Sequence, residues 1–306
     1  ENEIEVLISV HKEQGEPWDW PALASSLPPV PPTRQPHNEL KARERLVISE
    51  SQLEMAAQVK TAQQKDEQAY QEELQAHARE VEEWENLSTL ARRIVAGEHA
   101  AYIDAIRELS PFTELDGIGS SFHFAVRTPK FIECEITTDG RKAIPSEVKT
   151  LTASGKVSTR SMPKNRFVEI YQDYVCGCVL RVAREVSALL PVDTMILTAT
   201  AETLDTTTGK NVERPFLSVV ITRETLKDLN FDRLDPSDTI LSLQHRGDLK
   251  ATRKTGDFEY VTPISASEVV QPTNERNEIE SLIAGTRRMR DQIAKEIAAL
   301  NPQSSD

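Results

Sequence analysis

The sequence has few cysteines and glycines and no long apolar run. Only three of its 306 residues are cysteine, at 134, 176 and 178, and this odd, low number argues against a disulfide framework and for a reducing compartment. Glycine is also scarce, with 11 residues, which disfavours turn-rich all-β folds and favours long helices. No run approaches the roughly 18 apolar residues that a membrane span needs, and no signal peptide is visible. We therefore expect a cytoplasmic protein without a membrane segment.

Basic residues are outnumbered by acidic ones. The chain has 49 Asp and Glu against 36 Lys and Arg, a formal charge of -13. This balance excludes a globally basic nucleic-acid coat protein but leaves room for a local basic patch. With 38% apolar residues, the chain can form one sizeable core, and its length predicts one large domain or two smaller ones.

The first third of the chain is predicted to be helical, apart from one spacer. Residues 1–36 comprise two short helices and a proline-rich spacer, with five prolines in 27–36 that exclude helix or central strand. Residues 37–97 have neither proline nor glycine before Gly97 and are rich in helix formers. They predict a long, coiled-coil-like arm, either one helix or a helical hairpin with a break near 61–65. Its part 66–85 carries eight acidic residues.

The chemistry of the chain changes after the arm. Residues 98–265 predict an α/β core in which a helix at 98–109 precedes alternating strands at 121–127 and 131–137 and a third strand within 143–151. An apolar helix at 163–190 and strands at 194–201 and 216–222 follow. The fold class is therefore α+β with an αβββαβ-type core. Residues 266–306 form a C-terminal amphipathic helix and tail, with a coiled-coil stripe at 275–300.

The order of elements across 98–201 resembles the core of the PD-(D/E)xK nucleases, the restriction-endonuclease-like fold. That family uses an acidic residue near the second strand and Glu-x-Lys on the third. Here Asp139 follows the second predicted strand, and Glu147-Val148-Lys149 lies on the third, where alternation places Glu147 and Lys149 on one face. The resemblance implies catalytic roles for Asp139, Glu147 and Lys149: the two carboxylates would hold Mg²⁺, and the lysine would stabilise the attacking water or the developing charge.

A simpler interpretation of these residues stays open. Glu-x-Lys arises by chance in a charged chain, and Asp139-Gly140 is explained by turn chemistry. Whether the protein is an enzyme is therefore left open, and no cofactor is assigned unless the nuclease hypothesis brings Mg²⁺. His123 is predicted to face away from its neighbours Phe122 and Phe124, on a polar strand face. Cys176 and Cys178 are predicted to be buried structural residues.

A basic segment surrounds the candidate motif. Residues 141–166 hold seven basic residues against the single acid Glu147. Besides Lys149, the candidates for contact with phosphate or nucleic acid are Arg141, Lys142, Lys156, Arg160, Lys164 and Arg166. The segment could equally be a solvated loop, or a dock for the acidic part 66–85 of the same chain or of a neighbour.

A second resemblance concerns a family rather than a fold. The blocks Met162–Phe167, Tyr171–Gly177 and Leu229–Asp238 resemble a widespread family of bacterial proteins without an assigned activity. Its members often carry a small β-rich N-terminal domain, which would precede Glu1 here. We therefore predict a bacterial assembly or partner-binding protein that forms a homo-oligomer or binds a protein partner through its helical arms. The alternatives are a Mg²⁺-dependent nuclease and a degenerate nuclease fold that binds nucleic acid without cutting.

Overall fold

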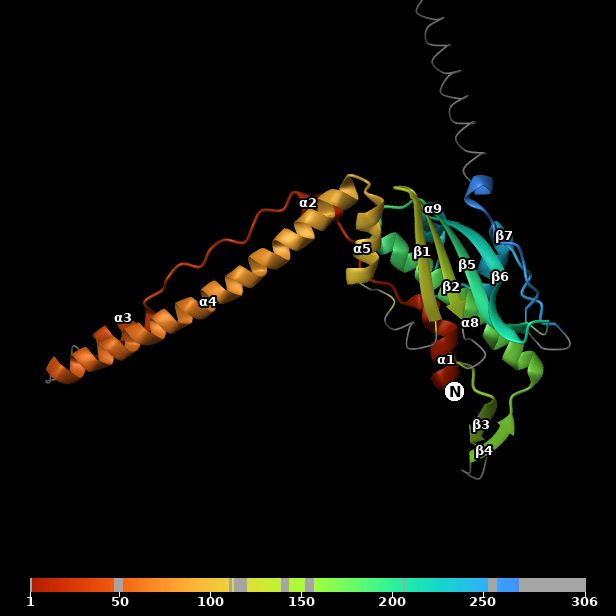
Figure 1. The fold of residues 1–306 in the computed structure, drawn as a ribbon. Helices are drawn as coiled ribbons and strands as arrows, with labels where there is room; N and C mark the ends of the chain where they lie inside the picture. Colours follow the sequence, from red (N-terminus) through yellow and green to blue (C-terminus); the bar gives the residue numbers. More distant parts are fainter. Residues whose placement is uncertain are drawn as a thin grey trace, which may run out of the picture. The chain divides into compact units, whose positions relative to one another are not determined.

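The computed structural model describes residues 2–46, 52–109, 112, 120–138, 143–151, 157–205, 207–252 and 258–269. They fall into two compact units (Figure 1). The arm unit is Trp18–Ala105, and the core unit combines the residues up to Pro17 with those from Ile106 onward. The predicted segment 1–36 is thus divided, since its first helix belongs to the core unit and its proline-rich part to the arm unit. The α+β class is confirmed.

The arm unit is built on one long helix. Helix α4 (Gln52–Val95) has 44 residues, about 66 Å at 1.5 Å per residue, and it continues through 61–65 without a break. A separate helix, α3 (His37–Leu46), packs against α4, as does the short helix α2 (Trp20–Ala24). After α4 the chain turns at Gly97, whose φ of 78° favours glycine, and enters α5 (His99–Leu109).

Between residues 59 and 84, one stripe of α4 is shielded from solvent. Its buried or half-buried residues recur every three or four positions, which places them on one side of the helix. They include Ala62, Tyr70, Leu74, Val81 and Trp84. The stripe is covered by α3 at one end and by α2 at the other, and the proline-rich segment runs between them along α4 (Figure 1).

The proline-rich segment between α2 and α3, which we call the strap, runs along α4 and has about the same length as the part of α4 that it contacts. Three contacts join them: Trp84 Nε1 donates to Ser26 Oγ at 2.9 Å, His77 Nε2 lies 3.2 Å from Pro29 O, and Arg34 pairs with Glu67 at 3.2 Å. Eight residues of extended strap span roughly 25 Å at 3.1 Å each. The 17 residues of α4 between the outer contacts span about the same distance. The extended conformation that the prolines impose therefore matches the helix beneath it.

Asp66 of α4 caps the beginning of α3. Its carboxylate is 4% exposed and accepts hydrogen bonds from the backbone N–H groups of Asn38 and Glu39, at 3.0 and 2.9 Å, and from Asn38 Nδ2 at 2.7 Å. Burial raises the pKa of this carboxyl, but the hydrogen bonds from Glu39 and Asn38 outweigh it and hold the pKa below its usual value. The cap ties the end of the strap to α4.

The core unit contains a five-stranded mixed sheet in the order β1-β2-β5-β6-β7. The strands are β1 (Ser120–Thr128), β2 (Phe131–Thr138), β5 (Thr194–Asp205), β6 (Lys210–Thr222) and β7 (His245–Arg246). Strands β2 and β5 are parallel and the other neighbours are antiparallel. A parallel pair needs a crossover, which here contains helix α8 (Lys164–Leu189).

The third predicted strand does not join this sheet. Strand β3 (Glu147–Leu151) pairs with β4 (Val157–Ser161) in a separate two-stranded sheet, and β4 was not predicted. The predicted αβββαβ order therefore gains one strand before α8. The reason lies in the residues, since most described side chains of this hairpin are exposed and polar. Such strands offer no apolar face to bury in the main sheet.

Helix α8 is the centre of the core unit. It is buried along most of its length from Ile170 to Leu189, because the sheet covers one side and other helices cover the opposite side. The covering elements are α1 (Asn2–Ser9), the 3-10 turn η1 (Val10–Lys12) and α10 (Pro236–Ser242). Helix α9 (Arg223–Asp228) follows β6.

Two predictions for the end of the chain have different outcomes. The sequence also predicts a last strand at 258–262, and the structure has only one bridge there, between Ala251 and Phe258. The predicted helix at 275–300 lies outside the described residues. None of the described helices combines the length and apolarity that a membrane span requires.

Candidate functional site

The β3–β4 hairpin carries the predicted Glu-x-Lys motif. Glu147 lies opposite Ser161 and Lys149 lies opposite Thr159, so alternation places both charged side chains on one face of the hairpin. Both are exposed. The hairpin projects from the connection between β2 and α8 and shares no strand pair with the five-stranded sheet (Figure 1).

The partners that a metal ion would need are not found beside this motif in the described part of the chain. Asp139, the second predicted ligand, lies outside the described residues. Among the residues that the structure covers, no group of three or more His, Cys, Asp or Glu side chains could hold a metal ion. One carboxylate falls short of the oxygen ligands that Mg²⁺ takes from proteins and substrates. We therefore derive no step through Mg²⁺, and Glu147 and Lys149 remain predicted catalytic residues.

The described basic residues around the motif point in several directions. Arg160 lies opposite Val148, on the face of the hairpin away from Lys149. Lys164 is the first residue of α8, and Arg166 pairs with Glu169 at 3.3 Å. Lys149, Arg160 and Lys164 form no ion pair with any described residue and can contact an anionic surface. The other three candidates, Arg141, Lys142 and Lys156, lie outside the described residues.

The structure also shows a hollow that the sequence analysis did not single out. It lies on the outer face of the five-stranded sheet, opposite α8, and holds about 320 Å³. His123, Glu135 and Thr198 form a row across three neighbouring strands along its floor. The expected orientation of His123 is confirmed, since its neighbours Phe122 and Phe124 pack on Phe112 on the other face.

Two separate pairs of hydroxyl groups are hydrogen-bonded at the floor of the hollow. Thr200 Oγ1 donates to Thr137 Oγ1 at 3.1 Å, and the hydroxyls of Thr198 and Ser218 lie 3.1 Å apart. Ser218 Oγ also accepts the backbone N–H of Ile264 at 3.0 Å. This last bond fastens the segment after Phe258 to the sheet, where it forms one wall of the hollow.

The charged groups of the hollow are unequally satisfied. Arg127 Nε donates to Glu133 Oε2 at 2.7 Å, and this hydrogen bond raises the pKa of Arg127. The side chains of Glu135 and His123 are exposed and make no hydrogen bond or ion pair with the residues described. The hollow therefore combines one satisfied ion pair with one carboxylate that is available to a ligand.

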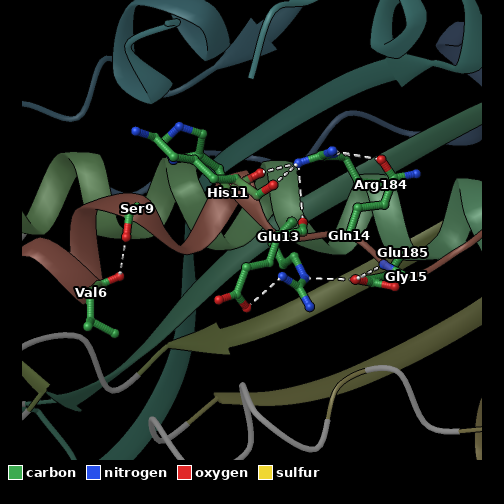
Figure 2. Close-up of polar contacts among 10 residues, drawn as sticks. Val6, Ser9, His11, Glu13, Gln14, Gly15, Arg184 and Glu185 are labelled. Carbon is green, nitrogen blue, oxygen red and sulfur yellow. Dashed lines mark hydrogen bonds and ion pairs between the residues drawn. The ribbon is translucent and has the colours of Figure 1, made fainter. Parts of the chain in front are cut away.

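A second polar cluster holds the N-terminal segment on α8 (Figure 2). Arg184 Nη1 donates to the backbone oxygens of His11, Lys12 and Glu13 at 2.6, 2.9 and 3.2 Å, where η1 ends. Its Nη2 donates to Gln14 Oε1 at 2.7 Å. These bonds satisfy carbonyls that a helix leaves without partners at its C-terminal end, so the cluster has a structural role.

Glu185 extends this cluster on α8. Its Oε1 accepts the backbone N–H of Gly15 at 3.0 Å and lies 2.8 Å from Arg181 Nε (Figure 2). A side chain at Gly15 would crowd Glu185, because a Cβ there would lie 2.9 Å from Glu185 Oε2.

His11 lies in the same cluster and is buried. Burial lowers the pKa of His11, and the nearby charges of Lys12 and Arg184 lower it further.

The remaining buried titratable groups argue against nucleophilic catalysis by thiols. Cys134, Cys176 and Cys178 are buried and free, as was predicted for the latter pair. Burial raises the pKa of Cys178 to about 12 and those of the other two well above the usual value. A thiol must ionise to attack, so these residues are structural.

Comparison with known proteins adds no family. No family model matches the chain, and no significant match is found among curated proteins or solved structures. The predicted resemblances therefore stay predictions, and a functional assignment has to depend on the geometry of the described residues.

Proposed function

We propose that the protein works by assembly, in which the acidic face of α4 in one copy binds the basic β3–β4 hairpin of another. The observation that carries the proposal is that other segments of the same chain already cover the apolar side of α4. Its apolar stripe is already occupied by α2, the strap and α3. A partner that binds α4 itself would therefore meet polar, mainly acidic surface, whereas Leu27 and Val30 of the strap expose apolar side chains.

The exposed surface of α4 has unbalanced negative charge. Its exposed acids that pair with no described cation are Glu72, Glu73, Glu80, Glu82, Glu83 and Glu85. Like charges three or four residues apart on a helix repel one another. A cationic partner would relieve that repulsion, and the cost of desolvation is small because both surfaces stay partly hydrated.

The hairpin offers the complementary charge. Lys149 and Arg160 lie on its two faces and Lys164 follows it, each without an ion pair in the described chain. Because the two surfaces differ, the contact would be heterologous, which gives a ring or an open chain of copies rather than a symmetric dimer.

A nucleic acid is the second candidate partner for the hairpin. The observation in its favour is that Glu147 and Lys149 share one exposed face, beside cations that suit a phosphate backbone. In this alternative the protein is a Mg²⁺-dependent nuclease or binds nucleic acid without cutting. A cytoplasmic location stays our expectation, supported by the three unpaired thiols.

Sedimentation velocity tests the assembly proposal. We expect the full chain to associate at micromolar concentration in 50 mM salt and to dissociate in 500 mM salt, where exposed charges are screened. Lys149→Glu with Arg160→Glu should abolish association. The matched control is Lys210→Glu with Lys227→Glu, two exposed lysines on other elements, which should leave it unchanged.

Four outcomes would separate the candidates. Association restored by mixing the hairpin variant with a Glu80→Lys, Glu83→Lys variant would identify the two surfaces as partners. A wild-type protein that is monomeric at 100 μM in low salt would refute the assembly.

Salt-sensitive binding of labelled DNA or RNA, lost in the hairpin variant, would favour the nucleic-acid alternative. Mg²⁺-dependent cleavage that Glu147→Ala removes would favour the nuclease.

A further inference from the structure

The geometry points to the hollow on the outer sheet face as a binding site for an organic ammonium ion, either a free diamine or the end of a lysine side chain. This site shares no residue with the assembly surfaces on the hairpin and α4, so the two proposals are independent. What the hollow can bind depends on which of its groups can still accept a hydrogen bond and on what charge is left there.

One hydroxyl of the floor is oriented by its own hydrogen bond. Thr200 gives its only hydroxyl hydrogen to Thr137, so toward the hollow it can only accept. Thr198 and Ser218 share one hydrogen bond in which either can be the donor, and Ser218 also accepts the N–H of Ile264. Thr198 and Thr200 therefore offer acceptor oxygens to a ligand, and His123 adds a ring N–H donor beside them.

The charge of the hollow is negative. Glu133 is balanced by Arg127, which donates to it at 2.7 Å. Glu135 lies beside Thr198 in the next strand and has no partner among the described residues. The hollow therefore keeps one carboxylate in excess, next to at least one hydroxyl acceptor.

An ammonium group matches this pattern better than other common ligands do. It carries one positive charge and three donors and has no acceptor. Anions would meet the Glu135 carboxylate, and the binding of a neutral polyol would leave its charge unpaired. The walls add apolar surface from Ala125, Pro215 and Pro263, against which a short carbon chain can pack.

The volume agrees with a small ligand. About 320 Å³ is at the lower end of the range for small-molecule sites. A four-carbon diamine or one lysine side chain fits this space. For a ligand of so few atoms, we expect a dissociation constant on the order of 1 mM.

The experiment follows methyl signals of the full chain by NMR during titration with three probes. Putrescine represents the free diamine, and N-acetyl-lysine amide represents the lysine side chain. Butane-1,4-diol has the same chain length as putrescine without its charges. We expect saturable shifts at Ala125 and Ile196 with at least one amine and none with the diol. The amine that binds more tightly identifies the source of the ligand.

Two variants decide whether the named residues are responsible. Glu135→Gln keeps the size of an exposed side chain and should weaken binding about tenfold or more, as loss of a charge-assisted hydrogen bond does. The matched control is Glu202→Gln, another exposed glutamate of the same sheet, which should bind as the wild type does. No saturable shift up to 20 mM amine, equal binding by Glu135→Gln, or equal binding of the diol would overturn the proposal.

Discussion

The ion pair between Arg181 and Glu185 on α8 tests how the N-terminal segment is held in the core unit. Glu185 is 2% exposed and Arg181 is 8% exposed, and their side chains approach to 2.8 Å. Glu185→Leu removes the carboxylate from both the guanidinium and the backbone N–H of Gly15. Arg181→Met with Glu185→Leu removes both charges and replaces them with apolar side chains of similar size.

The two changes should have very different costs. Removal of one partner of a buried ion pair costs about 3–5 kcal/mol when the other charge is left without compensation. Arg181 keeps a second ion pair, from Nη1 to Glu13 Oε2 at 3.0 Å, so we expect the loss at the lower end of that range. The unpaired N–H of Gly15 adds about 1 kcal/mol. The double variant should recover most of this loss, since well-packed apolar pairs are often as stable as the buried ion pair that they replace. The coupling energy between the two sites should therefore exceed about 2 kcal/mol.

The assay uses the division of the chain into two units. The three tryptophans, at 18, 20 and 84, lie in the arm unit, so their fluorescence during urea unfolding follows that unit alone. Hydrogen exchange of the α8 amides follows the core unit. We expect Glu185→Leu to lower the opening free energy of α8 and to leave the tryptophan transition in place.

Two results would refute this reasoning. A loss below about 1 kcal/mol in Glu185→Leu would mean that the pair behaves like an exposed one. A double variant as unstable as the sum of its single variants would mean that the two side chains act independently.

Three further predictions concern the same unit. Gly177→Ala should cost about 1–3 kcal/mol by overpacking, because its Cβ would lie 2.8 Å from Cγ1 of the stiff Val10 side chain, and Val10→Ala should restore thermal stability in the double variant. Burial lowers the pKa of His11 in the folded state below the unfolded value of 6.5. The stability that its neutral form contributes is therefore complete above that pH and is lost as the pH falls below it, and His11→Leu should flatten this pH dependence of the unfolding free energy. Because the pKa of Cys178 is raised to about 12, the folded protein should react with no aromatic disulfide reagent at pH 8 until urea unfolds it, and rapid labelling would contradict the burial of the thiols.

The elements that sequence analysis predicted well are those whose pattern is set locally. Helix α4 has no glycine or proline and α8 is largely apolar, so both are evident from composition and periodicity. Alternation likewise identified β1 and β2, and β5 was predicted as a buried strand. The hairpin illustrates the limit, because the pattern of β3 indicates a strand but cannot say which strand it pairs with.

The hollow could not be predicted for a related reason. Its floor joins His123 and Glu135 to Thr198 only because β2 and β5 are parallel neighbours, separated in the chain by the β3–β4 hairpin and α8. Alternation did place His123 on a polar face, which was the one available signal. The choice of Glu135 as the unpaired acid depends on the Arg127–Glu133 ion pair, which sequence spacing alone does not specify.

The strap changes what the arm can do. A long helix with one apolar stripe normally buries that stripe against a second helix, and the sequence favoured self-association through such a coiled coil. Here an extended segment of the same chain lies in register along the stripe, and Asp66 secures its far end. An intramolecular partner acts at an effective concentration of about millimolar or more, so a second copy at micromolar concentration does not displace it. In the proposed assembly, contacts of α4 would then use its charged faces, and they should weaken with salt rather than strengthen as apolar contacts do.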